Sequence, residues 1–275
     1  ISPGIPPSHP FVIKARSENV KVVSDLELFK RYANPSCKII GITGSNGKST
    51  TASLVYHILK TAGKKVFLGG NIGVSPLTQK ALEAEYVVLE ISSFQLEYTD
   101  FIFDASALLN IQADHLSYHG GMEEYKTAKA KILKNSKFGL KSFECAESKN
   151  LQATAEVSIT KILPKGYTLV ANNFYKDGNW ELSLPQFKHL VGAHNMQNIA
   201  FAIALCFDFI GLSSNQIIEG IQSFVPLQHR IEFVKKIDGI DFINDSKATN
   251  AASTITALKC FQGRSIFLIA GGRQK

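Results

Sequence analysis

The chain contains 275 residues, of which 45% are hydrophobic and 19% charged, and no run approaches the roughly 18 uninterrupted apolar residues of a membrane span. These proportions indicate a globular protein without a membrane partner. The formal net charge of +7 is spread along the chain, so nucleic acid explains it less well than anionic small substrates or an ordinary solvated surface. The four cysteines include no Cys-x-x-Cys pair, which argues against a disulfide framework or a zinc ribbon and favours the cytoplasm.

The first half of the chain alternates strand-like and helix-like segments. Its start, "ISPGIPPSHP", has neither the basic end nor the apolar core of a secretory signal and lacks an initiator methionine, so it looks internal. Strands are then predicted at 37–43, 64–70, 86–91 and 105–111, and helices at 49–62, 77–84 and 123–137. This alternation predicts an α/β fold with a mainly parallel sheet, whose ligands gather at the carboxyl ends of the strands.

The second half of the chain is less regular. Short alternating runs in 150–190, with an Asp-Gly turn at 177–178, predict a small antiparallel insertion, and 199–212 reads as a buried helix. Near Pro226 the α/β pattern restarts with a hairpin about 238–239, a helix at 251–261 and a strand at 265–272. That is the opening of a second, Rossmann-like domain and too little to close a sheet, so the chain is expected to be truncated at both ends.

The stretch "GITGSNGKST", residues 41–50, stands between the first strand and the first long helix. Its spacing departs from the usual phosphate-loop pattern, because Ile42 holds the place of the early glycine. Gly41, Gly44 and Gly47 nevertheless recur every third residue, which would leave backbone amides free to bind an anion. A structural turn with a chance Gly-Lys-Ser is the alternative.

The residues after the third glycine add the chemistry of a mononucleotide site. Lys48 would supply a positive charge for the β and γ phosphates, and the hydroxyl of Ser49 or Thr50 would ligate the magnesium that accompanies ATP. No Asn-Lys-x-Asp motif for guanine is present, so ATP is preferred over GTP.

Two further side chains follow predicted strands. Glu90 ends the apolar run "YVVLE", beside the phosphate loop, where a hard cation needs oxygen ligands; a solvated glutamate at a strand end is the alternative. His115 follows the strand at 105–111, although a lone histidine is more often structural than a metal ligand.

Lys129 stands out on the helix predicted at 123–137. Tyr125, Ala128, Ile132 and Ser136 form one stripe of that helix, and Lys129 is the lysine that lies inside it. Burial disfavours the charged ammonium and lowers its pKa, which makes the amine reactive or demands an anionic partner. Snorkelling along the helix and a simple ion pair are the alternatives.

Taken together, these motifs resemble the Mur ligase family. The matching stretches stand in the family's order: "SPGIP" at 2–6, "GITGSNGKST" at 41–50, "GGNIG" at 69–73, "EISSFQLE" at 90–97, "ADHL" at 113–116, "YKTAKAKI" at 125–132, "GAHNMQN" at 192–198, "HRIE" at 229–232 and "NDSKATN" at 244–250. The stretches at 2–6, 90–97 and 244–250 favour the family member that adds D-glutamate. The likeness is weakest over 139–190, and Ser117 stands where the family usually has an aspartate.

The resemblance implies a site with ATP and two magnesium ions. The catalytic residues would be Lys48, His115, Lys129 and Arg230. The ATP-binding residues would be Gly44, Asn46, Gly47, Lys48, Ser49, Thr50, Asn195, Asn198, Arg230, Asp245 and Lys247. The metal ligands would be Ser49, Glu90, His115 and a carbamylated Lys129, in which the buried cation becomes an anion. The substrate contacts would be Ser2, Pro3, Gly4, Asn71, Ser92, Thr249 and Lys275.

The resemblance also implies a domain organisation and an activity. Residues 1–36 would be the remnant of an amino-terminal UDP-binding domain and linker, 37–225 a central domain with a P-loop-type ATPase core, and 226–275 the start of a carboxyl-terminal amino-acid-binding domain. The expected activity is ligation of D-glutamate to UDP-N-acetylmuramoyl-L-alanine through an acyl phosphate, in peptidoglycan precursor synthesis, by a cytoplasmic monomer. The alternatives are another Mur-type or folylpolyglutamate-type ligase and a non-catalytic ATP-binding module.

Overall fold

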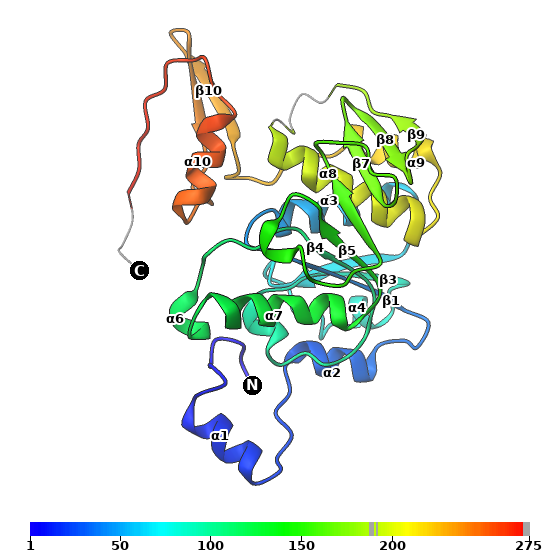
Figure 1. The fold of residues 1–275 in the computed structure, drawn as a ribbon, viewed down its shortest axis with the longest axis vertical. Coiled ribbons are helices and arrows are strands. Elements are labelled where there is room, and N and C mark those ends of the chain that lie inside the picture. Colours follow the sequence, from blue (N-terminus) through cyan, green and yellow to red (C-terminus); the bar gives the residue numbers. More distant parts are fainter. Residues whose placement is uncertain (187–189, 191, 272–275) are drawn as a thin grey trace.

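The computed structural model describes residues 1–186, 190 and 192–271, and it is built around one large sheet (Figure 1). In the described residues this sheet has nine strands in the order β2-β3-β1-β4-β5-β6-β7-β8-β9. Their bounds are β1 Lys38–Thr43, β2 Val66–Gly70, β3 Tyr86–Glu90, β4 Phe103–Leu108, β5 Ser136–Ser142, β6 Ala155–Ser158, β7 Tyr167–Val170, β8 Asn173–Lys176 and β9 Asn179–Ser183. Neighbours from β2 to β7 pair in parallel, which confirms the predicted α/β class.

Helices cover both faces of this sheet. The helices of the described residues are α1 Pro10–Ser17, α2 Asp25–Tyr32, α3 Lys48–Thr61, α4 Gln79–Leu82, α5 Ser93–Leu96, α6 Leu116–His119, α7 Met122–Lys134, α8 Ala193–Ala204, α9 Ser214–Gln222 and α10 Ala251–Lys259, with short 3-10 and π turns at η1 Ala146–Ser148 and η2 Leu205–Phe209; α1 and α10 lie away from the sheet (Figure 1). Helices α3, α8 and α9 pack together, whereas α7 packs on β4 and β5 from the other side.

The alternation of side chains along β1 explains why the sheet is buried on both sides. Ile40 and Ile42 belong to the apolar cluster beneath α3 and α8, whereas Ile39 belongs to the cluster beneath α2 and α7. Successive strand residues point to opposite faces, so a run of apolar residues can feed two cores at once. The uninterrupted apolar runs that predicted β1 and β3 therefore reflect a sheet sandwiched between helices.

The antiparallel segment predicted within 150–190 is present as β7, β8 and β9. Asp177 and Gly178 both have positive φ, 50° and 81°, as a two-residue hairpin turn requires. The segment does not stand apart from the main sheet, because β6 and β7 join it to β5 through parallel pairing. It therefore extends the edge of the same sheet.

Several predicted boundaries need correction. The helix predicted at 123–137 ends at Lys134, because Ser136 already pairs with Phe103 as the first residue of β5. The helix predicted at 77–84 is reduced to the single turn of α4. The helix predicted at 199–212 begins earlier, at Ala193, and turns π-helical from Leu205.

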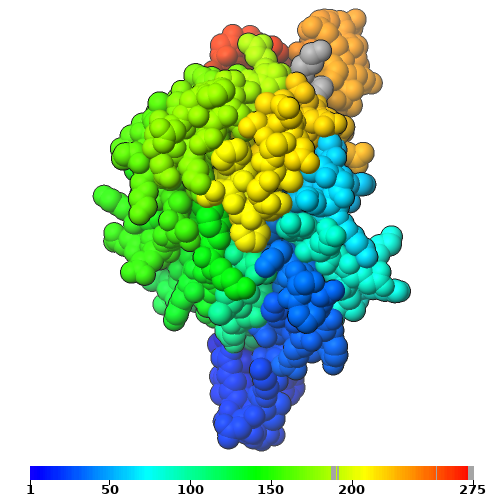
Figure 2. All heavy atoms as spheres, turned by 90° about the vertical axis from the view of Figure 1, so that its right-hand side faces the viewer, coloured from blue at the N-terminus to red at the C-terminus, as the bar shows by residue number. Residues whose placement is uncertain are grey.

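The carboxyl-terminal segment projects from the main body at the end opposite α1 (Figures 1 and 2). It contains the hairpin of β10 (Glu232–Ile237) and β11 (Ile240–Asn244), turning at Asp238-Gly239 as predicted, followed by α10. The strand predicted at 265–272 is wrong over its described part, residues 265–271, because no described strand pairs with it and its apolar side chains are exposed. None of the described helices combines the length and apolar character needed to cross a bilayer.

Candidate active site

The phosphate-loop sequence forms the turn from β1 into α3, at the carboxyl edge of the sheet. Gly47 is the N-cap of α3 with φ of 85°, a left-handed conformation that favours glycine. A Cβ on Gly47 would also lie only 2.4 Å from Oδ1 of Asn198. Glycine is thus required at position 47 both by the left-handed backbone conformation and by the close approach of Asn198 on α8.

Gly41 does not belong to this turn, which corrects the prediction of a three-glycine cradle. It lies inside β1, where a Cβ would come within 2.9 Å of the Phe103 ring. Its role is close packing under α7. The anion-binding capacity of the loop therefore rests on the residues from Gly44 onward, and above all on the amide groups at the first turn of α3.

Two lysines, Lys129 buried and Lys48 partly buried, converge on one carbonyl of this loop. Nζ of Lys48 donates to the Gly44 carbonyl at 2.8 Å and to that of Ser45 at 2.9 Å, and Nζ of Lys129, on α7, donates to the Gly44 carbonyl at 2.9 Å. Burial lowers the pKa of Lys48, against the opposing effect of the Glu90 carboxylate. Burial, reinforced by the charge of Lys48, lowers the pKa of Lys129 well below its ordinary value. The inward position predicted for Lys129 is confirmed, with 1% of the residue exposed.

Glu90 ends β3 next to the loop and is 3% exposed. Its Oε1 accepts a hydrogen bond from Nδ2 of Asn71 at 2.8 Å, while its Oε2 is buried without a hydrogen-bond partner in the described structure. A buried carboxylate oxygen without a partner is costly unless a cation satisfies it. The unpartnered carboxylate oxygen therefore suits a hard divalent cation, which prefers oxygen ligands.

His115 lies at the same edge of the sheet, but it is not part of a preformed metal cluster. It is the N-cap of α6 in a left-handed conformation, and its ring packs 5.0 Å from that of Phe94. The side chain of Asp114, next to it, raises the pKa of both Lys48 and Lys129 against the larger effect of burial, which relates this segment to the two lysines. Among residues 1–186, 190 and 192–271, no three His, Cys, Asp or Glu side chains are grouped to hold a metal.

The two predicted asparagines of α8 face the start of α3. Oδ1 of Asn198 accepts from the Thr51 hydroxyl at 3.1 Å, and its Nδ2 donates to Oδ1 of Asn195 at 3.3 Å. Asn198 is 3% exposed. The pair thus lines the loop on the side opposite α7.

The carboxyl-terminal segment reaches the loop at two points. Nη2 of Arg230 donates to the Ser49 hydroxyl at 3.0 Å, and the Ser253 hydroxyl on α10 donates to Oδ1 of Asn46 at 2.9 Å. Asp245 accepts from the amide of Ile231 at 3.1 Å, and burial raises its pKa. Lys247 and Thr249, which follow Asp245 in the chain, are exposed. Lys275 lies outside the described residues.

The predicted substrate contacts at the amino-terminal side are tied to protein groups. The Tyr118 hydroxyl donates to the Pro3 carbonyl at 2.8 Å, while Ser2 and Gly4 are exposed. Ser92 caps α5 through a reciprocal pairing with Gln95, so its hydroxyl is used in building the helix. Asn71 is held by Glu90, as described above.

Residues outside the predicted site set also contact the loop. Asn110 and Gln112 bond Asn46, Tyr125 bonds the Ser45 hydroxyl, and the charge of Asp114 acts on Lys129. The segment 110–114 follows β4, the neighbour of β1, so the rule that ligands gather at strand ends could have pointed to it. The hydrogen bonds themselves could not be anticipated without the pairing of β1 with β4.

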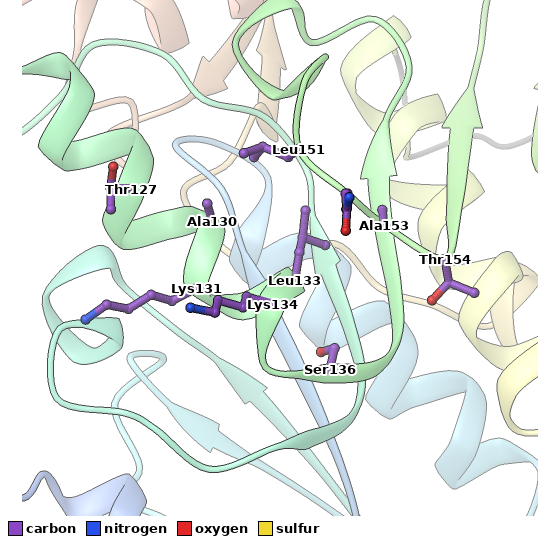
Figure 3. A pocket seen from close by; sticks show the side chains of 10 residues that line it. Thr127, Ala130, Lys131, Leu133, Lys134, Ser136, Leu151, Ala153 and Thr154 are labelled. Atoms are coloured by element: carbon purple, nitrogen blue, oxygen red, sulfur yellow. The ribbon is translucent and has the colours of Figure 1, made fainter.

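A cavity of about 780 Å³ lies away from this site, between α7 and residues 151–154 (Figure 3). Thr127, Ala130 and Lys131 are among its lining residues, and none of the predicted site residues is. The chemistry of the side chains, rather than cavity size, therefore identifies the candidate active site at the phosphate loop.

Comparisons with known proteins agree with the geometry. Residues 42–206 match the model of the Mur ligase middle domain. The chain is 38% identical over 288 residues to the UDP-N-acetylmuramoylalanine--D-glutamate ligase of Rickettsia prowazekii (strain Madrid E), covering 100% of this chain and 63% of that protein. The Wolbachia pipientis wMel ligase of the same name is 36% identical, with 100% of this chain and 66% of the relative covered. The chain thus spans somewhat less than two thirds of these relatives.

Solved structures of lower identity share the fold. MurF from Acinetobacter baumannii superposes with a TM-score of 0.68 at 21% identity, covering 88% of this chain and 58% of that one. MurC from Thermotoga maritima superposes with a TM-score of 0.64 at 24% identity, covering 94% of this chain and 62% of that one. The family match over more than half of the chain, together with the relatives at 36% and 38% identity, shows that this chain belongs to the Mur ligase family.

Proposed function

We propose that this chain is part of an enzyme that adds D-glutamate to UDP-N-acetylmuramoyl-L-alanine at the expense of ATP, the MurD reaction of peptidoglycan precursor synthesis. The observation that carries the proposal is the convergence of Lys48, Lys129 and the loop carbonyl of Gly44 beside the buried carboxylate of Glu90. The proposed substrates are those in the names of the relatives that are 36–39% identical over the whole chain.

The reaction requires a carboxylate to meet the γ-phosphate of ATP. Lys48 would neutralise phosphate oxygens at the first turn of α3, and Arg230, which contacts Ser49, would approach the same phosphates from the carboxyl-terminal segment. The acyl phosphate would then be attacked by the D-glutamate amine. Catalysis in this scheme is mostly positioning and charge stabilisation, which suits a site made of amides and lysines.

The unpartnered oxygen of Glu90 suits magnesium, and we propose that the site takes two such ions. Glu90 and Ser49 would hold one, and His115 with Lys129 the other, if Lys129 carries a carbamate. Bound magnesium would supply charge neutralisation for the carboxylate and phosphate oxygens. The partnerless Oε2 of Glu90 and the low pKa of Lys129 are the observations that support this arrangement.

We also propose the remaining parts of the organisation predicted from the sequence. Residues 37–225 form the ATP-binding domain, flanked by parts of a UDP-binding domain before residue 37 and of an amino-acid-binding domain from 226. Asn195, Asn198, Asp245 and Lys247 complete the nucleotide site, and Asn71 and Thr249 lie toward the substrates. The enzyme is a cytoplasmic monomer that binds no nucleic acid.

Phosphate release by the full-length protein tests the proposal. Release should require both UDP-N-acetylmuramoyl-L-alanine and D-glutamate, and L-alanine or a diamino acid should not replace D-glutamate. Lys48→Ala should lower kcat by about a hundred- to a thousand-fold, the usual cost of removing one such charge, whereas Lys60→Ala at the exposed end of α3 should not. ATP hydrolysis that needs neither substrate would favour a non-catalytic ATP-binding module instead.

A further inference from the structure

One asparagine outside the family motifs pairs with the phosphate loop through both ends of its side-chain amide. Asn110 follows β4, 64 residues from Asn46 in the sequence. Its Oδ1 accepts from the backbone amide of Asn46 at 2.9 Å, and its Nδ2 donates to the backbone carbonyl of the same residue at 3.1 Å. Its own carbonyl accepts from the amide of Ser45 at 3.0 Å. Asn110 therefore engages two consecutive residues of the loop.

These bonds divide the loop amides into two groups. The amides of Ser45 and Asn46 are committed to Asn110, so they are not available to a ligand. The amides at the first turn of α3, from Gly47 onward, have no partner within the helix, as at any helix start. The phosphate-binding amides are thus those that follow immediately after the residue that Asn110 holds.

The neighbours of Asn110 reinforce the same segment. Gln112 accepts from Nδ2 of Asn46 at 2.8 Å, and its backbone amide and carbonyl both bond the Ser45 hydroxyl, at 2.8 and 2.9 Å. Asn110, by contrast, bonds both the N–H and the C=O of one loop residue with a single side chain. An aspartate of the same shape would keep the acceptor and lose the donor, placing a carboxylate oxygen against a carbonyl.

We propose that Asn110 is a positioning residue for the nucleotide phosphates: by bonding both the N–H and the C=O of Asn46, it holds the loop so that the amides from Gly47 onward point at the β-phosphate. The inference rests on the proposed nucleotide site but concerns a residue outside the set assigned to it. Without Asn110 the loop would have to be ordered when the nucleotide binds, so affinity would fall while the chemical step stayed largely intact.

The test is calorimetric titration of Mg·ADP and Mg·ATP into the full-length protein and its Asn110→Ala and Asn110→Asp variants. Both variants should bind both nucleotides about tenfold more weakly, the scale of ordering one or two residues. In steady state the KM for ATP should rise to match, with kcat within about threefold and the KM for D-glutamate unchanged. Asn34→Ala removes a similar side-chain acceptor, bonded to Ser36 in the turn before β1, and should change none of these values.

The outcomes separate the inference from the function on which it rests. If the wild type binds nucleotide and Asn110→Ala binds it with the same affinity, the positioning role alone is overturned. A wild-type protein that bound no nucleotide would overturn the proposed function together with the inference. If Asn110→Ala does not fold, the isosteric Asn110→Asp variant decides. A large loss of kcat in that variant, with the KM for ATP unchanged, would indicate general damage to the site and contradict the proposal.

Discussion

Lys48 and Lys129, on helices at opposite faces of the sheet, donate to the same carbonyl oxygen, that of Gly44, at 2.8 and 2.9 Å. Two ammonium groups that share one acceptor repel each other, and Lys129 is buried while Lys48 is partly buried. The pKa of Lys129 is lowered well below its ordinary value, by burial first and by the charge of Lys48 second, so the site makes the neutral amine easier to reach than in a free lysine. A neutral amine is nucleophilic, and the contact therefore prepares Lys129 for modification.

The first prediction is that carbon dioxide modifies Lys129 selectively. The neutral amine would attack the carbon of CO₂, forming an N–C bond and releasing one proton, and the resulting carbamate carries a negative charge. Protein equilibrated with ¹³C-labelled bicarbonate should show a carbamate resonance that is absent in Lys129→Arg. Lys134→Arg, on the exposed side of the same helix, should retain it. Equal labelling of both variants would contradict the prediction.

The second prediction concerns the partnerless oxygen of Glu90. Glu90→Gln keeps an acceptor for Asn71 and removes a charge whose burial cost offsets its attraction to Lys48, so the metal-free protein should change little in stability. At saturating ADP, Mg²⁺ at a hundred times its Kd should raise the free energy of unfolding of the wild type by about 2.7 kcal/mol and that of Glu90→Gln by far less. Thermal or denaturant unfolding with and without Mg²⁺ measures the difference. Glu83→Gln, at an exposed ion pair, should respond to Mg²⁺ as the wild type does.

The third prediction separates the two reasons for glycine at position 47. Gly47→Ala combines a left-handed φ with a contact of 2.4 Å to Oδ1 of Asn198, which is buried and bonded to Thr51 and so cannot easily move. We expect a loss of about 2–4 kcal/mol of stability. Gly63→Ala has a similar φ of 76° but open space around it, and should lose about 1–2 kcal/mol. Equal losses in denaturant unfolding would show that the contact with Asn198 contributes nothing.

The parts of the fold that the sequence predicted well are those where a local pattern and its burial agree. The apolar runs of β1, β3 and β4 and the amphipathic pattern of α7 with Lys129 inside are such cases. The apolar run at 265–271 is the opposite case, because an apolar segment forms a strand only where a neighbour offers backbone groups to pair with.

The candidate site was predictable where a motif carries the chemistry and not where topology creates it. Lys48 and Glu90 could be identified from their place after apolar runs. The bonds of Asn71 to Glu90 and of Asn110 to Asn46 depend on the adjacency of β2 with β3 and of β1 with β4, which no local pattern contains. The same adjacency explains why the glycine spacing wrongly places Gly41 in the loop: its neighbour Phe103 is distant in sequence.

The last prediction uses a carboxylate outside the active site to test the pH dependence of the fold. Oδ2 of Asp104 accepts from the amide of Ile39 at 3.0 Å and Oδ1 from Nζ of Lys137 at 2.8 Å. Burial raises the pKa of Asp104, but these hydrogen bonds outweigh it and hold the pKa below its ordinary value. Because its pKa is lowered in the folded state, ionised Asp104 stabilises the fold above the unfolded-state pKa of 3.8, and this stabilisation is lost as the pH falls through the folded-state pKa.

Asp104→Asn should therefore lower the free energy of unfolding by about 1–2 kcal/mol at pH 7. In urea unfolding, this difference from the wild type should close below about pH 4. Glu123→Gln, whose ion pair with Lys126 is exposed, should cost almost nothing at either pH, and a gap for Asp104→Asn that stayed constant down to pH 3 would show that its charge is not the stabilising feature.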